Sequence, residues 1–366
     1  MSFSFKFNSN TTAGCANQHY FLSDGAPRVS RAYFKISAAG EYNYSLLFSG
    51  ILDSSYRRIS FHDEPCAGWK IHSASVGKLH AFPSGADPKA IKDEEALRPI
   101  WLASLTFGGS AEKAVTPELF ASDPVRLAFS EGEYLALELE YSGEKIPCLP
   151  EVAFPVYTKT PLGWEYSVNM PLPCMIGCDR PVKEMITYLG DSITQGADLP
   201  TNSYGHWVAK LAKMLPAHYS HWNLGIGLGK VSDVSDGGVW YQKALLGSTV
   251  FVCYGVNDIN SDKPASLICS ELHALVASLK SEGKRVILQA VPPFDYPEPR
   301  RVVWEQVNAY IMSELSSLAD HTFNPGTVLS KSNDEPHLTR FGGHPCEDGC
   351  ILWAEELYKS ISHLFP

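Results

Sequence analysis

The residue whose type and position best suit covalent chemistry is Ser192. The apolar, β-prone run 186–189 leads into the turn Gly190-Asp191-Ser192, and a helical pattern follows. A serine between a strand's carboxyl end and a helix has its hydroxyl at the mouth of a sheet, beside unpaired backbone N–H groups, where a nucleophile would be placed. An isolated Gly-Asp-Ser is more often a helix cap, so the rest of the chain must decide. The following helix would carry Tyr204, Trp207, Val208, Leu211 and Leu215.

Two later blocks could hold negative charge at such a site. Residues 223–229, Asn-Leu-Gly-Ile-Gly-Leu-Gly, follow the short run 221–222, and glycines let a backbone aim N–H groups at a ligand. Asn257 follows an apolar run, and its amide can donate to a developing oxyanion. Each block alone could also be an ordinary strand end or turn. The glycine spacing does not fit a dinucleotide fingerprint, so no such cofactor is expected.

His344 is the candidate general base. Pro345 restricts His344 to extended geometry, which places the imidazole on a rigid loop ahead of a C-terminal helix. Imidazole is the side chain best suited to accept a hydroxyl proton near neutral pH. The chain has 12 histidines, and only this local context distinguishes His344. His337 is a rival base because Asp334 stands three residues before it, but His337 lacks the following proline and helix.

Taken in order, these blocks resemble those of the SGNH hydrolases, also called the GDSL esterase/lipase family. The nucleophile block is 190–192, the glycine block 223–229, the asparagine block 255–258 and the histidine block 344–345. The resemblance covers about residues 183–366. It implies a three-layer α/β fold with a parallel sheet, and a serine esterase.

The resemblance also implies a role for each residue. Ser192 would attack the acyl carbon and His344 would take its proton. The oxyanion would be held by the Ser192 N–H, by an N–H of the glycine block at Gly227, Gly229 or a neighbour, and by the Asn257 side chain. Asp191 and Asp258 would brace their loops by hydrogen bonds.

Two positions depart from the family pattern. Phe341 stands where an aspartate usually orients the imidazole, so we predict a Ser-His dyad with a backbone carbonyl near 341–343 as the imidazole's partner. Asp334 or Glu335 is the alternative partner. Leu228 stands where many members have the oxyanion glycine, which is a mild change because the donor is a backbone N–H.

The expected substrate is a small acyl ester, acetyl by preference, on a sugar or oligosaccharide. A β-rich half ahead of an SGNH domain is similar in layout to carbohydrate esterase family 2. The aromatic residues of loop 292–299 could shape the pocket, although plain loop packing explains them equally well. A short-chain lipid or thioester esterase remains open, as does a catalytically degenerate carbohydrate-binding protein.

The composition excludes several classes of protein. The chain has 366 residues, 45% hydrophobic and 19% charged, with a net charge of −10, which argues against nucleic-acid binding. No segment is apolar enough to span a membrane, and no secretory signal is visible, so a cytoplasmic location is expected, with secretion as the alternative. The nine cysteines lack a disulfide framework and are expected to be reduced. Cysteine pairs 174/178 and 346/350 lack further ligands, so no metal and no cofactor are expected. The oligomeric state stays undetermined.

The two halves of the chain have different patterns. Up to about residue 150, short alternating runs predict antiparallel strands and a sandwich-like all-β domain. The proline-rich stretch 147–181 would be a crossing segment with one further strand, ending in a linker. We therefore place the domains at 1–181 and 182–366. The predicted N-terminal strands are 32–36, 42–48, 100–105 and 135–141, the last of them half-buried.

In the second half, apolar runs 249–254 and 285–290 alternate with helices, which predicts a parallel sheet covered on both sides. One helix begins after Pro264 and ends at Gly283. Function is expected at the carboxyl ends of the strands. The apolar face of this helix is Ile268, Leu272, Leu275, Val276 and Leu279, and that of the C-terminal helix is Leu352, Trp353, Leu357 and Ile361.

Overall fold

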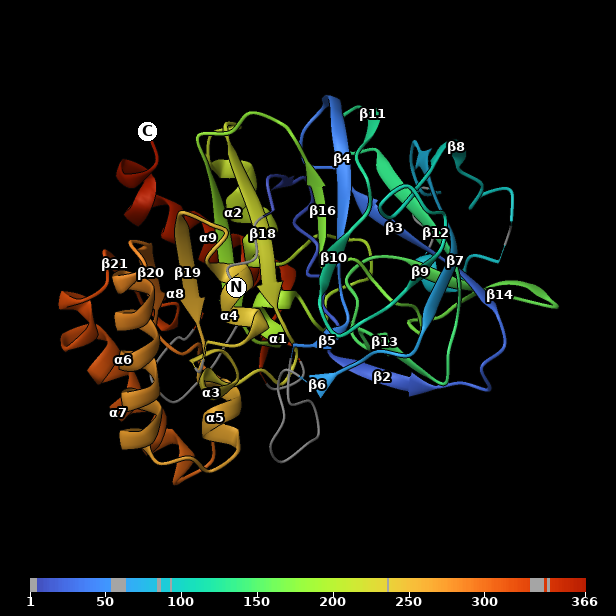
Figure 1. The fold of residues 1–366 in the computed structure, drawn as a ribbon. Coiled ribbons are helices and arrows are strands. Elements are labelled where there is room, and N and C mark those ends of the chain that lie inside the picture. Colours follow the sequence, from blue (N-terminus) through green and yellow to red (C-terminus); the bar gives the residue numbers. More distant parts are fainter. Residues whose placement is uncertain are drawn as a thin grey trace. The chain divides into compact units, whose positions relative to one another are not determined.

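The computed structural model describes residues 5–53, 64–83, 87–92, 94–235, 237–329, 339–340 and 343–366, without the side chains of 235, 339 and 340. These residues form two compact units (Figure 1). The N-terminal unit comprises Phe5–Pro181 and Pro200–Tyr204, and the C-terminal unit comprises Val182–Leu199 and Gly205–Pro366. The short segment Pro200–Tyr204, which the sequence places in the second domain, thus belongs to the first unit.

The N-terminal unit is built largely of antiparallel strands and is sandwich-like. One sheet has the order β1-β16-β4-β10, with β11 also on β4, and the other has the order β15-β14-β3-β12-β7-β8, with β9 also on β7. The first comprises β1 (Asn8–Ser9), β16 (Met175–Cys178), β4 (Gly40–Ser49), β10 (Leu119–Ala121) and β11 (Val125–Phe129). The second comprises β15 (Gly163–Tyr166), β14 (Val156–Thr160), β3 (Arg28–Lys35), β12 (Tyr134–Ser142), β7 (Lys70–Leu79), β8 (Ile100–Ser104) and β9 (Lys113–Ala114). Smaller elements are the pairs β2 (His19–Leu22) with β13 (Lys145–Cys148) and β5 (Ile51–Leu52) with β6 (Glu64–Pro65), and the 3-10 turn η1 (Pro88–Ala90).

Two sequence predictions for this unit need correction. The predicted alternation of strand β12 holds from Leu137 to Ser142, where buried and partly buried residues alternate, but it fails at Ala136, which is as fully buried as Leu135 and Leu137. On the face of β12 that carries Ala136 and Glu138, the Glu138 carboxylate pairs with the guanidinium of Arg31 from β3 at 2.6 Å. The stretch 147–181 contains three strands and not the one further strand expected: β14 and β15 join one sheet, and β16 joins the other. Pro147 lies in β13, and the other prolines of this stretch fall outside the strands, where no ladder hydrogen bond is lost.

The C-terminal unit contains a parallel sheet of order β18-β17-β19-β20-β21, as the alternating pattern predicts. The chain passes from β17 to β18 on one side of it and then returns to β19 on the other side, so the strand order reverses at β17. In open parallel sheets, ligands bind at such a switch point, beyond the carboxyl ends of the strands. The strands are β17 (Glu184–Gly190), β18 (Tyr219–Gly225), β19 (Thr249–Cys253), β20 (Arg285–Gln289) and β21 (His321–Phe323), with the separate pair β22 (Thr339–Arg340) and β23 (His344–Pro345).

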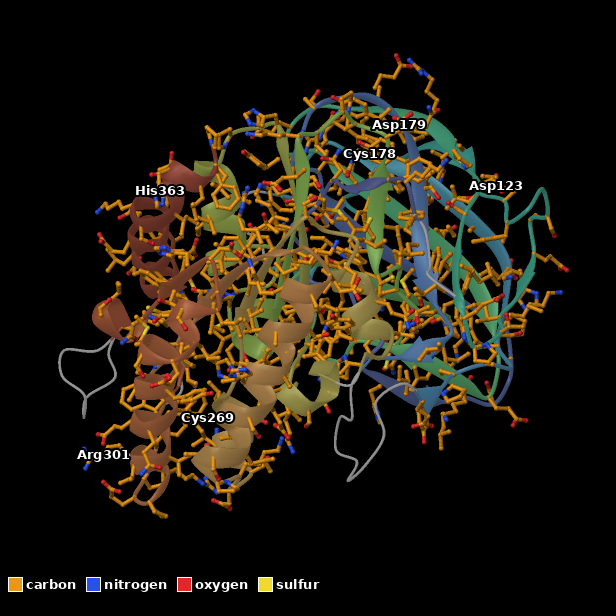
Figure 2. The ribbon with its side chains drawn as sticks, turned by 60° about the vertical axis from the view of Figure 1, so that its left-hand side comes forward. Asp123, Cys178, Asp179, Cys269, Arg301 and His363 are labelled. Carbon is orange, nitrogen blue, oxygen red and sulfur yellow. The ribbon has the colours of Figure 1, made fainter. Side chains whose placement is uncertain are left out.

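Helices cover both faces of this sheet. On one face, Tyr188 of β17 packs edge-on against Trp207 of α2, which stacks on Trp353 of α9 with 5.2 Å between ring centroids. On the other face, Thr187 donates a hydrogen bond to the carbonyl of Ala244 in α4. Helices α6 and α7 lie side by side (Figures 1 and 2). The helices are α1 (Ser192–Gln195), α2 (Trp207–Met214), α3 (Val231–Ser235), α4 (Val239–Ala244), α5 (Val256–Asn260), α6 (Ala265–Ser281), α7 (Arg300–Ser313), α8 (Gly326–Leu329) and α9 (Glu347–Ile361), with 3-10 turns η2 (Leu315–Ser317) and η3 (Ser362–Leu364).

The predicted helix over 265–282 is confirmed, with Pro264 as its N-cap and all five predicted apolar residues buried. Gly283 follows its C-cap in the left-handed region at φ +70°. Helix α2 begins only at Trp207, so Tyr204 is not part of it, contrary to the predicted pattern. Tyr204 adopts φ +50° and belongs to the N-terminal unit. Among the described residues, no helix combines the length and apolar character needed to cross a bilayer.

Candidate active site

Ser192 is the first residue of α1, directly after β17, as the sequence predicts. Asp191 caps this helix by accepting a 3.0 Å hydrogen bond from the Ile193 N–H. Gly190 is required at the strand end, because a Cβ there would lie 2.0 Å from Oγ1 of Thr194 and 2.9 Å from the Cys253 carbonyl. The sharp strand-to-helix turn therefore fixes the Ser192 hydroxyl at the carboxyl edge of the sheet.

His344 reaches this serine. Nε2 of His344 lies 2.9 Å from Oγ of Ser192, within hydrogen-bonding distance. Its ring packs edge-on against Phe294, with centroids 5.7 Å apart. Gly343 allows this approach, because a Cβ there would lie 2.1 Å from the Phe294 ring. Loop 292–299 thus contributes at least one aromatic side chain beside the imidazole.

The other imidazole nitrogen pairs with a residue that the sequence does not suggest. Oδ2 of Asp198 lies 3.0 Å from Nδ1 of His344. The predicted dyad, with a backbone carbonyl near 341–343 as the imidazole's partner, is therefore wrong for this nitrogen. Asp198 lies just beyond α1, after the left-handed C-cap Gly196, and itself adopts φ +62°.

The remaining alternatives lie outside the described residues. These are the possible partners Asp334 and Glu335, the rival base His337, and Phe341. No signal in the spacing marks Asp198, since it follows the nucleophile by a few residues instead of preceding the histidine. Only the turn chemistry of Asp198-Leu199-Pro200, a polar residue ahead of a proline, sets this position apart in sequence.

The electrostatics of the pair keep the base in its accepting form. Burial lowers the pKa of His344, and the nearby Asp198 carboxylate opposes this by raising it. Because burial has the larger effect, the pKa lies below the ordinary histidine value of about 6.5. His344 is therefore neutral at pH 7, with Nδ1–H held by Asp198 and Nε2 available to accept the hydroxyl proton.

The glycine block forms the loop after β18, but Gly227 and Gly229 are not its available donors. The Gly227 N–H donates to Oε1 of Gln195 at 2.5 Å, and the Gly229 N–H donates to the Ile226 carbonyl at 3.0 Å. The Leu228 N–H has no acceptor within the part of the chain that the structure describes. Leu228 also adopts φ +60°, the left-handed conformation that glycine favours. The two N–H groups that the sequence nominates are thus engaged, and that of Leu228 between them is without an acceptor among the described residues.

Asn257 lies in α5 and is joined to the same loop. Its Nδ2 donates to the Gly229 carbonyl at 3.1 Å, and the second amide hydrogen stays available for another acceptor. Gly255, at φ +127°, makes the turn into α5, since a Cβ there would lie 2.6 Å from Val291. The glycine loop thus fixes the Asn257 amide close to its own backbone N–H groups.

Asp258 braces these loops, as expected for this residue. Its Oδ2 accepts from the Val231 N–H at 3.2 Å, and its Oδ1 pairs with the Lys263 ammonium at 2.8 Å. Asp258 is fully buried, and these partners satisfy both of its carboxylate oxygens. Its contacts among the described residues hold the loops and do not include the imidazole.

No metal-binding cluster of three or more histidine, cysteine or acidic side chains is found among the described residues. All nine cysteines are free thiols. Cys178 lies at the end of β16 and Cys269 on α6 (Figure 2).

Residues 188–349 match the family model of the GDSL-like lipases and acylhydrolases. This chain contains a GDSL-like lipase/acylhydrolase domain. The predicted resemblance is confirmed for this domain, whose family is one of SGNH-type ester hydrolases. The matched range contains the nucleophile, glycine, asparagine and histidine blocks.

Several solved structures are similar to about half of this chain. A member of the lipolytic G-D-S-L family from Veillonella parvula is 21% identical, with a TM-score of 0.43, 49% of this chain covered and 98% of that chain. A variant of Axe2, an acetyl xylan esterase from Geobacillus stearothermophilus, is 19% identical, with a TM-score of 0.40 and coverages of 49% and 95%. The esterase EstA from Pseudoalteromonas sp. is 19% identical, with a TM-score of 0.40 and coverages of 49% and 97%. No curated protein matches the chain.

Proposed function

We propose that the protein hydrolyses a small acyl ester, acetyl by preference, carried on a carbohydrate. The observation that carries the esterase mechanism is the continuous set of short contacts from Asp198 through His344 to Ser192, at 3.0 and 2.9 Å. A carboxylate, an imidazole and a hydroxyl in this order form the arrangement that activates serine for acyl transfer.

The reaction proceeds in two halves. The Ser192 Oγ attacks the acyl carbon while its proton passes to Nε2 of His344, and the same proton then goes to the alcohol oxygen as the ester bond breaks. A water molecule then gives a proton to His344 and attacks the acyl-serine. The serine oxygen leaves, recovers the proton from His344, and the carboxylic acid is released. Asp198 holds the imidazole in the tautomer with hydrogen on Nδ1 and stabilises its protonated form.

Three N–H donors are assigned to the oxyanion that forms in each half. They are the backbone N–H groups of Ser192 and Leu228 and the free hydrogen of the Asn257 amide. The assignment rests on the Leu228 N–H having no acceptor in the described chain, whereas those of Gly227 and Gly229 are engaged. Donors fixed before the reaction cost no reorganisation when charge develops on the oxygen.

The carbohydrate part of the proposal rests on layout: a sandwich-like β unit precedes the GDSL-like domain, as in carbohydrate esterase family 2. Phe294 beside His344 supports a small acyl group, because an aromatic wall next to the base narrows the space for the acyl chain. A panel of acetyl-xylooligosaccharides, acyl-thioesters and longer p-nitrophenyl esters tests this. Higher kcat/KM on thioesters or on long acyl chains would replace the proposed substrate class.

The esterase activity itself is tested with p-nitrophenyl acetate. The Ser192→Ala and His344→Ala variants should each lose turnover by about 10³-fold or more, since either change removes the nucleophilic pair. Ser270→Ala and His273→Ala are matched controls, because both residues lie on α6, and should keep wild-type rates. Wild-type turnover that survives in Ser192→Ala would refute the mechanism. No turnover in the wild type would favour a degenerate carbohydrate-binding protein.

A further inference from the structure

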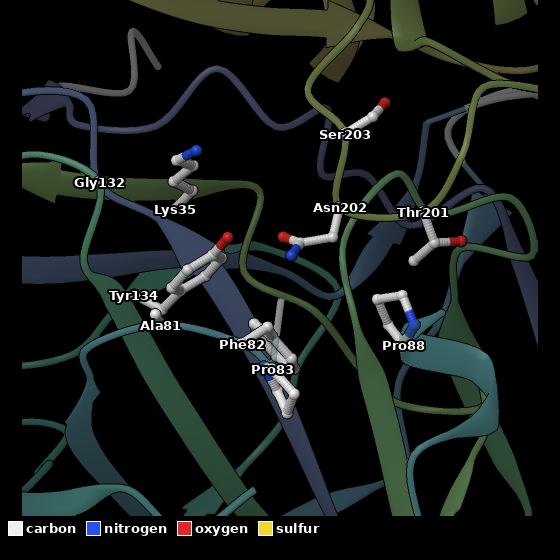
Figure 3. A pocket seen from close by; sticks show the side chains of 10 residues that line it. All are labelled: Lys35, Ala81, Phe82, Pro83, Pro88, Gly132, Tyr134, Thr201, Asn202 and Ser203. Carbon is white, nitrogen blue, oxygen red and sulfur yellow. The ribbon is translucent and has the colours of Figure 1, made fainter. Parts of the chain in front are cut away.

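The N-terminal unit contains a cavity of about 360 Å³ (Figure 3). Its lining comes from separate parts of the unit: the end of β3 at Lys35, the start of β12 at Tyr134, the stretch 81–83, and the segment Pro200–Tyr204. A volume of this size lies in the range of small-molecule sites. None of these residues takes part in the reaction proposed above, so the cavity needs its own explanation.

The segment Pro200–Tyr204 holds a strained asparagine at the cavity. Asn202 adopts φ +69° and its N–H donates to the Ala153 carbonyl at 2.7 Å. The buried Tyr204 hydroxyl accepts from the Lys35 N–H at 2.8 Å. Non-glycine residues persist in the left-handed region only where their surroundings fix them, and such residues cluster at binding sites. The backbone therefore presents the Asn202 amide to the cavity in a fixed position.

The hydrogen bonding of this amide is incomplete. Asn202 and Tyr134 share a side-chain hydrogen bond, and Figure 3 shows the two side chains pointing toward one another. Oδ1 of Asn202 is buried and has no hydrogen-bond partner within the described chain. A buried carbonyl without a donor is costly, and each such group in a native protein needs a reason. A ligand hydroxyl, met by a small turn of the amide, would supply the missing donor.

An aromatic ring lies beside these polar groups. Phe82 meets Tyr33 edge-on at 5.1 Å and Tyr134 edge-on at 5.0 Å, which fixes the orientation of its ring. Pro83 and Pro88 line the same cavity, and no carboxylate is found among the described residues that line it. Flat apolar faces next to an amide and hydroxyls match the chemistry of a sugar ring, whose C–H faces pack on rings while its hydroxyls form hydrogen bonds.

We propose that this cavity binds a neutral sugar unit of an oligosaccharide, with Phe82 against the ring face and the Asn202 and Tyr134 side chains bonded to its hydroxyls. The choice of a saccharide as ligand rests on the proposed function. The cavity is a separate site, and its occupancy does not require ester hydrolysis.

Calorimetric titration of the full chain carrying Ser192→Ala with unacetylated xylotetraose and cellotetraose tests the proposal. Saturable binding to at least one of them is expected. Phe82→Leu, which removes the flat ring, and Asn202→Gly, which removes the amide but keeps the left-handed backbone, should each weaken binding about tenfold. No saturable binding to either sugar, or binding unchanged in both variants, would overturn the proposal.

Matched controls separate the cavity from the rest of the surface. Trp101→Leu removes an exposed aromatic ring of the same unit on β8, and Asp262→Gly introduces glycine at another left-handed position, φ +59°. Neither should change the dissociation constant. Loss of binding in Trp101→Leu but not in Phe82→Leu would place the sugar elsewhere and refute the assignment. The result is independent of the esterase test, because binding is measured without an ester and without the nucleophile.

Discussion

The carboxylate of Asp198 lies 3.0 Å from Nδ1 of His344, although Asp198 follows the nucleophile helix and His344 precedes the last helix of the chain. The carboxylate beside the imidazole thus comes from the loop beyond α1. The family pattern places it three residues before the histidine, where this chain has Phe341. Because Asp198 lies beside Nδ1 of the imidazole, it can orient the ring although it comes from a different part of the chain.

Asp198→Asn should lower kcat by about 10²-fold. Replacing a buried orienting acid costs about 10⁴-fold, and the Asp198 side chain is 44% exposed, so a smaller loss is expected. The variant also removes the charge that raises the pKa of His344, so the acid limb of the kcat/KM profile should move to lower pH. The wild-type limb should already lie below the ordinary histidine value. A limb that moves to higher pH would show that Asp198 is not the partner of the imidazole.

The Leu228 position should depend on backbone conformation and not on the leucine side chain. Leu228→Gly keeps the N–H and suits φ +60°, so ester hydrolysis should stay within about threefold of wild type. Leu228→Val places a β-branched residue where it is disfavoured, which should displace the N–H and reduce kcat by up to about 10²-fold. Measuring kcat for both variants checks this. Equal losses in both would assign the effect to the side chain instead.

Asn257→Ala should reduce kcat by about 10²–10³-fold with little change in KM, because the donor acts on charge that appears in the transition state. Asn260→Ala, in the same short helix, is the matched control and should retain activity. Steady-state kinetics on a short-chain ester separate the two constants. A rise in KM with unchanged kcat would mean that Asn257 binds the ground state only.

Asp191→Asn should change how stability depends on pH. Burial, reinforced by the nearby Asp258 charge, raises the pKa of Asp191 to about 7. Between the unfolded value of about 4 and about 7, the folded protein retains a proton that the unfolded chain has lost, so the wild type should lose stability as pH rises through this window. The asparagine variant lacks this contribution and can still cap α1.

Denaturant unfolding at pH 5 and pH 8 checks this prediction. The free energy of unfolding should fall more between these values in the wild type than in Asp191→Asn. An equal change in both proteins would show that Asp191 is ionised in the folded state throughout this range.

Local sequence decided the elements that carry the site. The strand before Ser192, the glycine loop, the helix over 265–281 and the helix after His344 follow from hydrophobic period, glycine position and proline, all of which act within a few residues. The α/β class of the C-terminal unit and its parallel sheet follow from the same alternation. These features need no knowledge of which segments meet.

Only the tertiary structure decided the partners within the site. Asp198 pairs with His344 because the turn beyond α1, with Asp198 in the left-handed conformation, brings its carboxylate to the imidazole. Leu228 carries the available N–H because the N–H of the neighbouring Gly227 donates to Gln195. The burial of Ala136 in β12 and the assignment of Pro200–Tyr204 to the N-terminal unit likewise depend on what packs alongside. Period and propensity are local properties, whereas hydrogen-bond partners and burial are set by residues distant in sequence that share one place in the fold.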